Sequence, residues 1–292
     1  MRFGPTSHSF MSQRSRLHYV DWGNPDAPLL ILMHGNKDHC RSWDWVAERL
    51  CRDWHVVAPD LRGHGDSDWS AEGRYDFSSN VYDLAQLVFE LGGQQAVIMA
   101  HSMGSHIALR YAGIFPHNVA KLIAVEAVGA PREMEAEFKK LSPAMRYHNW
   151  IAARRNAVSK PPRIYASVED AQRRMQSENS WLTDNQARHL TIHGIRRTED
   201  GGYCWKFDNC LGLWPAVDHT SEEVFAFWRN IICPTLLVYG TASWQTDMAS
   251  QLEDHISDVC RIDIEGAGHW PQHDNFDRFM QEVEGFLRTG PV

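Results

Sequence analysis

The chain has 292 residues and a formal net charge of −8, with 43% hydrophobic and 23% charged residues. This composition predicts a packed core and excludes a disordered chain. Nucleic-acid binding needs a basic face, and the sequence has no Lys/Arg-rich run, so we expect no nucleic-acid partner. No apolar stretch reaches the roughly 18 residues of a membrane span, and the first residues lack the apolar part of a secretory signal. The six scattered cysteines form no CxxC pair, which favours free thiols and a cytoplasmic location.

Short apolar runs alternate with helical patterns along most of the chain. Continuous apolar runs are typical of strands that are buried on both faces of a parallel sheet. The expected strands cover residues 17–22, 28–34, 55–60, 95–100, 121–127, 234–240 and 259–265. The expected helices between them cover residues 43–50, 79–91, 103–115, 246–255 and 273–287. This alternation predicts right-handed βαβ crossovers and a mostly parallel sheet.

The alternation is interrupted between about residues 131 and 230. Apolar residues there recur at helical spacing, and a glycine turn near residue 201 precedes one short extended segment. Helices are expected at residues 133–156, 168–177 and 184–193. We therefore expect a helical cap at residues 131–230, inserted into an α/β core formed by residues 1–130 and 231–292.

The sequence Ala100-His101-Ser102-Met103-Gly104 lies where an expected strand meets an expected helix. A nucleophile elbow is a tight turn at such a junction, with small residues two before and two after the nucleophile. It lifts the Ser102 hydroxyl above the sheet and leaves the Met103 amide at a helix N-terminus, where an oxyanion is stabilised. A small-x-Ser-x-Gly match is weak alone, but the strand-turn-helix context makes it specific.

A serine hydroxyl needs a base to become a nucleophile. Among 16 histidines, His269 is the best candidate, because it follows the last expected strand in the glycine-rich segment Gly266-Ala267-Gly268. A side chain in such a loop can reach over the edge of the sheet. We interpret His101 as a supporting residue, since a sharp turn should point it away from the serine hydroxyl.

Four segments of the chain follow one another in a recognisable order: His34-Gly35, residues 60–67 (DLRGHGDS), the Ser102 elbow and the His269 loop. Together they resemble the α/β-hydrolase family from about residue 17 to residue 288. The resemblance implies an α/β-hydrolase fold, with a mostly parallel eight-stranded sheet flanked by helices and an inserted helical cap. It also implies an oxyanion hole formed by the amides of Asn36 and Met103. Residues 60–67 form a structural loop in most such proteins.

The acid of the catalytic triad is not at its usual place. Family members usually carry an aspartate in a Gly-x-x-Asp turn after the penultimate strand, and this chain has Gly240-Thr241-Ala242-Ser243 there. Two carboxylates remain as candidates, Glu126 at the end of the strand after the elbow helix and Asp247. We favour Glu126, because a carboxylate at the end of an apolar strand is costly without a partner. Asp247 lies at an expected helix start, where capping explains an aspartate.

The serine nucleophile limits the chemistry. Haloalkane dehalogenases and epoxide hydrolases of this fold attack with an aspartate, whereas Ser102 would form an acyl-enzyme from a carbonyl compound. We expect hydrolysis of a carboxylic ester or lactone; C–C bond hydrolysis and receptor-like ligand binding with little turnover are the alternatives.

The substrate is expected to be a small molecule. Trp244 and Trp270 adjoin the candidate site and are predicted to bind substrate, and the cap adds further tryptophans. Those are Trp150, Trp181, Trp205 and Trp214. No cofactor is expected, and no metal, because neither a His-Glu-x-x-His motif nor a cysteine pair occurs. The sequence leaves homo-oligomer formation open.

Overall fold

The computed structural model describes residues 4–128, 137–138, 140–213, 215–244 and 247–289. Trp214 and residues 131–136 of the expected cap lie outside the described residues. No helix among the described residues is long and apolar enough to cross a membrane.

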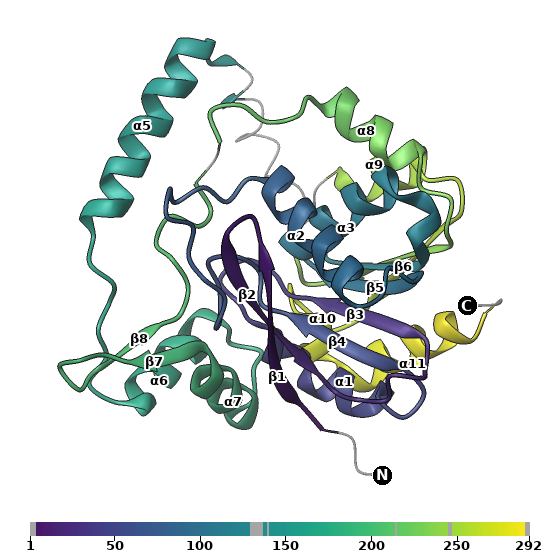
Figure 1. The fold of residues 1–292 in the computed structure, drawn as a ribbon, viewed down its shortest axis with the longest axis horizontal. Helices are drawn as coiled ribbons and strands as arrows, with labels where there is room; N and C mark the ends of the chain where they lie inside the picture. Colours follow the sequence, from purple (N-terminus) through teal and green to yellow (C-terminus); the bar gives the residue numbers. More distant parts are fainter. Residues whose placement is uncertain (1–3, 129–136, 139, 214, 245–246, 290–292) are drawn as a thin grey trace.

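An eight-stranded sheet in the order β1-β2-β4-β3-β5-β6-β9-β10 forms the core (Figure 1). The first two strands form an antiparallel hairpin, β2 pairs antiparallel with β4, and the other strands are parallel. The central strands β3, β4, β5 and β9 are buried along their whole length, as their continuous apolar runs predict. The strands are β1 (Thr6–Ser12), β2 (Ser15–Asp21), β3 (Leu29–Met33), β4 (His55–Pro59), β5 (Ala96–His101), β6 (Val119–Val125), β9 (Thr235–Gly240) and β10 (Val259–Ile264).

Helices cover both faces of this sheet. Figure 1 shows one group above the sheet and the other below it, and each group encloses its own apolar cluster. The upper group contains α2 (Phe77–Glu90), α3 (Met103–Ile114), α8 (Ser221–Arg229) and α9 (Met248–His255). The lower group contains α1 (Asp44–Leu50), α10 (Pro271–Asp274) and α11 (Phe276–Arg288), with the short 3-10 turn η1 (Cys40–Trp43) before α1. A second 3-10 turn, η2 (Pro116–Asn118), joins α3 to β6.

The segment between β6 and α8 lies to one side of the sheet, at the left of Figure 1. Its elements are α5 (Pro143–Ser159), α6 (Val168–Glu178), α7 (Asp184–Gly194), β7 (Ile195–Arg197) and β8 (Tyr203–Trp205). The helices α6 and α7 pack on each other, and β7 and β8 form a small antiparallel hairpin. α8 falls within the range expected for the cap but packs against α3 and α9 of the core.

Several elements differ from the sequence predictions. The strand β1 was not expected, because its residues are mostly exposed and lack an apolar run. The segment near residue 201 forms a two-stranded hairpin, not one extended segment. The last expected helix is two helices, which break at Asn275 where the backbone leaves the helical region (φ −140°, ψ 67°).

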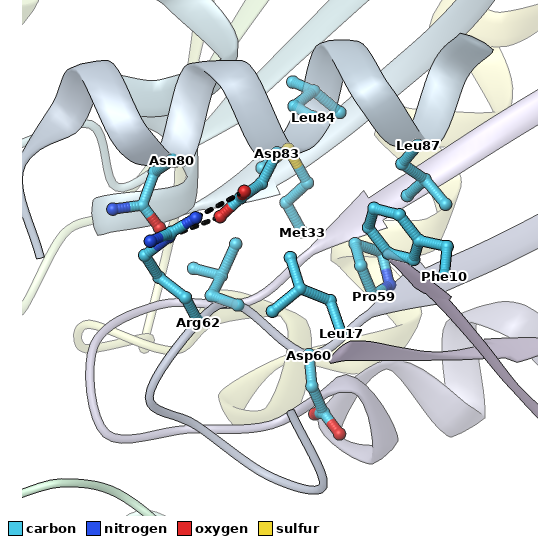
Figure 2. A pocket seen from close by; sticks show the side chains of 11 residues that line it. Phe10, Leu17, Met33, Pro59, Asp60, Arg62, Asn80, Asp83, Leu84 and Leu87 are labelled. Atoms are coloured by element: carbon cyan, nitrogen blue, oxygen red, sulfur yellow. Dashed lines mark hydrogen bonds and ion pairs between the residues drawn. The ribbon is translucent and has the colours of Figure 1, made fainter. Parts of the chain in front are cut away.

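The loop after β4 is held by a buried ion pair, which Figure 2 shows beside α2. The Arg62 guanidinium donates from Nη2 to Oδ1 of Asp83 at 2.6 Å, and Ser12 on β1 donates to the same oxygen. The adjoining cavity is lined by apolar residues such as Leu84 and has a volume of only about 10 Å³, too little for a ligand. This part of the residue 60–67 segment therefore joins the β1-β2 hairpin to α2.

Candidate active site

Ser102 occupies a strained turn between β5 and α3. Its backbone adopts φ 51° and ψ −117°, a region that non-glycine residues rarely enter and that is found where function requires it. The turn is held from below, because the Ser102 amide donates to the carbonyl oxygen of Val125 at 2.8 Å. The Ser105 hydroxyl also donates to the carbonyl oxygen of Ala100 at 2.6 Å. The sharp turn presents the Ser102 side chain above the carboxyl ends of the central strands.

Two glycines permit this close packing. A β-carbon at Gly104 would lie 2.6 Å from the carbonyl oxygen of His34, which is closer than real β-carbons approach. A β-carbon at Gly35 would lie 2.9 Å from Nδ1 of His101 and 3.1 Å from the β-carbon of Ser102. Gly104 therefore lets α3 approach β3, and Gly35 leaves room for the turn at Ser102.

His269, Ser102 and Glu126 form one chain of hydrogen bonds. Nε2 of His269 lies 3.0 Å from the Ser102 hydroxyl oxygen, and its Nδ1 lies 3.0 Å from Oε2 of Glu126. An ionised carboxylate only accepts hydrogen bonds, so Nδ1 carries the ring hydrogen and Nε2 offers its lone pair to the serine hydroxyl. This is the tautomer that a general base needs to take the serine proton.

Glu126 is completely buried directly after β6, in a left-handed backbone conformation with φ 51°. Besides His269, two donors satisfy its carboxylate: the Gly240 amide reaches Oε1 at 2.6 Å and the Ser243 hydroxyl reaches Oε2 at 2.6 Å. Three donors offset the cost of burying this charge. Ser243 stands where relatives usually carry the acid, and here it donates to the displaced carboxylate.

Asp247 is not the carboxylate that contacts His269. It occupies the N-cap position of α9, as expected, but accepts no capping hydrogen bond. Its backbone is in the right-handed helical region (φ −75°, ψ −4°), whereas a capping side chain needs an extended residue. The explanation of Asp247 as a helix cap was therefore wrong.

His101 is buried beneath the candidate base. Its Nε2 donates to the carbonyl oxygen of His269 at 2.7 Å, and the two rings lie 4.9 Å apart. Burial, together with the nearby ring of His269, lowers the pKa of His101 well below its usual range. His101 is thus a neutral donor that holds the His269 backbone, and neither of its ring nitrogens is hydrogen-bonded to the Ser102 hydroxyl.

A cavity of about 430 Å³ opens over Ser102 and His269. Trp244 stacks on the His269 ring at 4.2 Å with 30° between the planes, and it is 48% exposed. Asn36, one of the two expected oxyanion residues, also lines the cavity, while Met103 is the first residue of α3. The lining consists of Asn36, His101, Ser102, Glu178, Asn179, Ser180, Trp181, Ala242, Ser243, Trp244, Gly268, His269, Trp270 and Asp274.

The model of the alpha/beta hydrolase family matches residues 30–282 of this chain. The chain belongs to the α/β-hydrolase family. An esterase of Mycobacterium tuberculosis is 25% identical over 98% of this chain and 91% of its own length. Epoxide hydrolase 1 of Caenorhabditis elegans is 24% identical over 94% of this chain and 68% of its own length. A thioesterase domain from the curacin biosynthetic pathway superposes with a TM-score of 0.81 at 21% identity, covering 97% of this chain and 99% of that domain.

The cavity of this α/β hydrolase includes residues that the sequence did not single out. Asp274 on α10 accepts a hydrogen bond from the Gly268 amide at 2.8 Å, and burial raises its pKa. This contact holds the glycine loop before His269. Asp274 could have been found only from its position five residues after His269, a weak signal in a loop. Trp181, one of the tryptophans expected from the cap, lines the cavity from the segment between α6 and α7.

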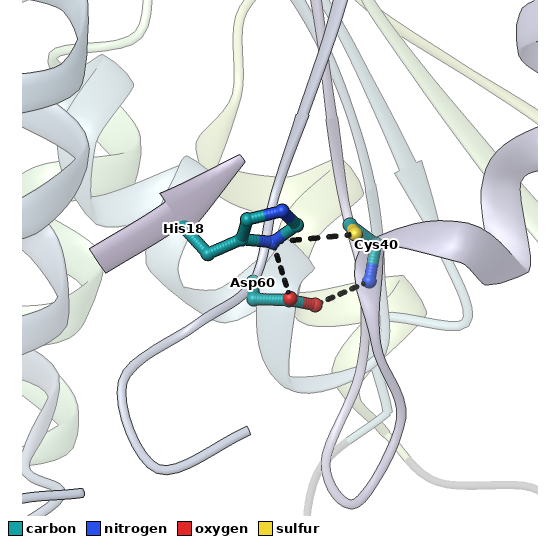
Figure 3. Close-up of side chains that lie close together, drawn as sticks. All are labelled: His18, Cys40 and Asp60. Atoms are coloured by element: carbon teal, nitrogen blue, oxygen red, sulfur yellow. Dashed lines mark hydrogen bonds and ion pairs between the residues drawn. The ribbon is translucent and has the colours of Figure 1, made fainter. Parts of the chain in front are cut away.

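Two groups of possible metal ligands occur among the described residues, and both are accounted for by contacts within the protein. Figure 3 shows the first, in which Oδ2 of Asp60 lies 2.7 Å from Nδ1 of His18 and Oδ1 accepts from the Cys40 amide at 2.7 Å. Burial and the Asp60 charge raise the pKa of the Cys40 thiol well above its usual value. This group instead fixes the loop after β4 against η1.

The second group is Asp44, His189 and His193, between α1 and α7. The Arg41 guanidinium already neutralises Asp44, with Nη2 2.6 Å from Oδ2, and its Nη1 lies 3.5 Å from Nδ1 of His193. A cation at this point would meet a resident positive charge. The residues therefore fit an ionic contact between the η1-α1 segment and α7 better than a metal centre.

Proposed function

We propose that this chain is a serine hydrolase that cleaves carboxylic esters or lactones through an acyl-enzyme on Ser102. The observation that carries the proposal is the continuous hydrogen-bonded chain from Ser102 through His269 to the buried Glu126. Nucleophile, base and orienting acid within hydrogen-bond reach are the arrangement that activates a serine hydroxyl. This chain of hydrogen bonds opens onto the cavity, where a substrate carbonyl can reach the Ser102 hydroxyl.

In the first half-reaction, the Ser102 oxygen attacks the substrate carbonyl carbon while Nε2 of His269 takes the hydroxyl proton. The Glu126 carboxylate stabilises the resulting imidazolium through Nδ1. The negative charge moves to the carbonyl oxygen, and we assign its stabilisation to the backbone amides of Asn36 and Met103. His269 then returns the proton to the alcohol oxygen, which leaves, and the acyl group remains on Ser102.

In the second half-reaction, water replaces the alcohol. His269 takes a proton from water as the water oxygen attacks the acyl carbon, and the carboxylic acid departs when the proton returns to Ser102. A lactone follows the same path, except that its alcohol stays covalently attached to the acyl group until hydrolysis. Apart from the substrate and water, both half-reactions use only groups that the described residues supply.

The cavity favours a compact substrate with an apolar part. Its volume of about 430 Å³ falls within the range of small-molecule sites, and three tryptophans contribute to its wall. Trp244 covers the face of His269, so it would lie beside the departing alcohol. Asn179 and Asp274 add polar groups at the same wall, which suits an ester that carries a polar substituent.

The serine argues against epoxide opening, although an epoxide hydrolase is among the relatives. Attack of the Ser102 oxygen on an epoxide carbon would leave an ether, which His269 and water do not hydrolyse. Attack on a carbonyl leaves an ester, which they do. The supported reaction class is therefore acyl transfer to water.

The test is a pre-steady-state assay with p-nitrophenyl acetate. We expect a burst of p-nitrophenol equivalent to the enzyme concentration and a mass increase of one acetyl group on the peptide that contains Ser102. Ser102→Ala should abolish both while the protein stays folded. Turnover that survives Ser102→Ala would overturn the proposal. A folded wild-type protein that shows no burst with esters or lactones, yet cleaves a vinylogous diketone, would favour C–C bond hydrolysis.

A further inference from the structure

The cavity over Ser102 carries an unneutralised negative charge. Among its described lining residues are the carboxylates of Glu178 and Asp274, and none is a lysine or arginine. Glu178 is paired with Arg174 of its own helix. Asp274 accepts a hydrogen bond from the Gly268 backbone, and no lysine or arginine of the described chain pairs with it. An anionic substrate would be repelled at Asp274, whereas a cationic one would be attracted.

Asp274 is half-buried close to the catalytic residues. Burial raises the pKa of its carboxyl, and the negative charge of Glu126 raises it further. Both effects disfavour the ionised carboxylate, and a positive charge placed beside it would offset both. A neutral hydrogen-bond donor would leave the repulsion between the two carboxylates in place. The surroundings of Asp274 therefore favour a cationic ligand over a neutral one.

Two exposed tryptophans line the same cavity. Trp181 is 52% exposed and Trp244 is 48% exposed, which makes them the two most exposed tryptophans of the described chain. The indole ring is a large apolar surface, and its electron-rich face attracts a cation. A substrate that covers these rings explains why both remain open beside the nucleophile.

Trp181 and Asp274 converge at Gly268, the residue before the base. A β-carbon at Gly268 would lie 3.3 Å from Nε1 of Trp181 and 3.4 Å from Oδ2 of Asp274. Neighbouring α-carbons are about 3.8 Å apart, so this point lies next to His269, which returns its proton to the leaving alcohol. A group bound there is therefore part of the alcohol half of the ester, a short carbon chain away from the ester oxygen.

We propose that Asp274 and Trp181 form a cation subsite, and that the substrate is an ester whose alcohol carries a quaternary ammonium group. This inference rests on the proposed ester hydrolysis and names its substrate class. The ammonium group lies between the Asp274 carboxylate and the face of Trp181, and Trp244 covers the alkyl chain beside His269. A quaternary ammonium donates no hydrogen bond, so a charge and an aromatic face suffice to bind it. This suits Asp274, whose Oδ2 already accepts from the backbone.

Asp274 also holds the Gly268 loop, and the two roles differ in their consequences. A displaced loop lowers kcat/KM for every ester alike, because His269 directly follows Gly268. A lost cation subsite lowers kcat/KM only for esters that carry a positive charge. The ratio of kcat/KM for a charged and a neutral ester, measured with one enzyme, therefore separates cation binding from loop positioning.

The experiment compares acetylcholine with its neutral carbon isostere, in which a tert-butyl group replaces the trimethylammonium group. Both esters have the same shape, and kcat/KM is measured from the release of acetic acid. We expect the wild type to favour acetylcholine by about tenfold or more, the scale of a partly desolvated ion pair combined with a cation–π contact. Asp274→Asn keeps an oxygen acceptor for the Gly268 amide and should bring the ratio to within about threefold of unity. Trp181→Leu should lower the ratio about threefold.

The matched control is Asp277→Asn, which removes the same charge from an exposed residue of α11 outside the cavity and should leave the ratio unchanged. A wild-type ratio at or below unity would overturn the cation subsite. A ratio that Asp274→Asn leaves unchanged, because both esters lose activity equally, would overturn it as well.

The burst with p-nitrophenyl acetate separates failure of the subsite from failure of the proposed function, because that ester carries no cation. If no ester is hydrolysed, the subsite is tested by binding to Ser102→Ala, followed by tryptophan fluorescence. Acetylcholine that binds at least about tenfold more tightly than its isostere supports the subsite, and equal binding of the two overturns it.

Discussion

The buried carboxylate of Glu126 gives the sharpest test of the proposed mechanism. In Glu126→Gln one oxygen becomes an amide nitrogen, which donates. The Gly240 backbone N–H can only donate, so the remaining side-chain oxygen must stay its acceptor. The new nitrogen then takes the place of Oε2 and faces His269 and Ser243. His269 then has to accept through Nδ1, which moves its hydrogen to Nε2. In that tautomer the ring cannot take the proton of Ser102.

We expect kcat for p-nitrophenyl acetate to fall by about 10³- to 10⁴-fold in Glu126→Gln, or about 4 to 5.5 kcal/mol of transition-state stabilisation. KM should change little, because Glu126 is completely buried and does not line the cavity. The rate of acylation should fall by the same factor, and circular dichroism should show an unchanged fold.

Two companion variants separate this explanation from a general disturbance of the site. Asp247→Asn should leave kcat within about threefold of the wild type, because the His269 ring contacts Glu126 and not Asp247. Ser243→Ala removes one of three donors to the carboxylate and should lower kcat by about tenfold or less. The reasoning fails if Glu126→Gln retains more than about a tenth of the wild-type kcat, or if Asp247→Asn matches its loss.

Three further outcomes follow from the described contacts. Gly35→Ala should lower kcat/KM by about 10²-fold or more, since a β-carbon there would lie 2.9 Å from the His101 ring; activity near the wild-type level would disprove this crowding. Trp244→Ala uncovers the stacked face of His269 and should raise KM about tenfold for aromatic esters but not for small aliphatic ones. Burial lowers the pKa of His64 from 6.5 to about 4. A buried histidine binds its proton more readily when unfolded, so stability falls as the pH drops from 6.5 towards 4. Between pH 7 and pH 5 this histidine accounts for a loss of about 2 kcal/mol of unfolding free energy, measured in urea. In His64→Leu that loss should be smaller by this amount, and an equal loss in both proteins would contradict the assignment.

The sequence alone determined the core of this fold. The apolar runs of β3, β4, β5 and β9 identify buried strands because a parallel sheet covered on both faces tolerates few polar residues. The small residues around Ser102 also identified the elbow, since a turn that tight excludes larger side chains. These features are local, and a local pattern is enough to predict them.

The tertiary structure decided what depends on distant contacts. β1 became a strand because β2 pairs with it, although its own residues are mostly exposed. The role of Ser243 as a donor to Glu126 joins positions 117 residues apart, and no spacing in the sequence encodes that distance. Burial and the pairing of donors with acceptors are properties of the assembled fold, so only the three-dimensional arrangement could determine them.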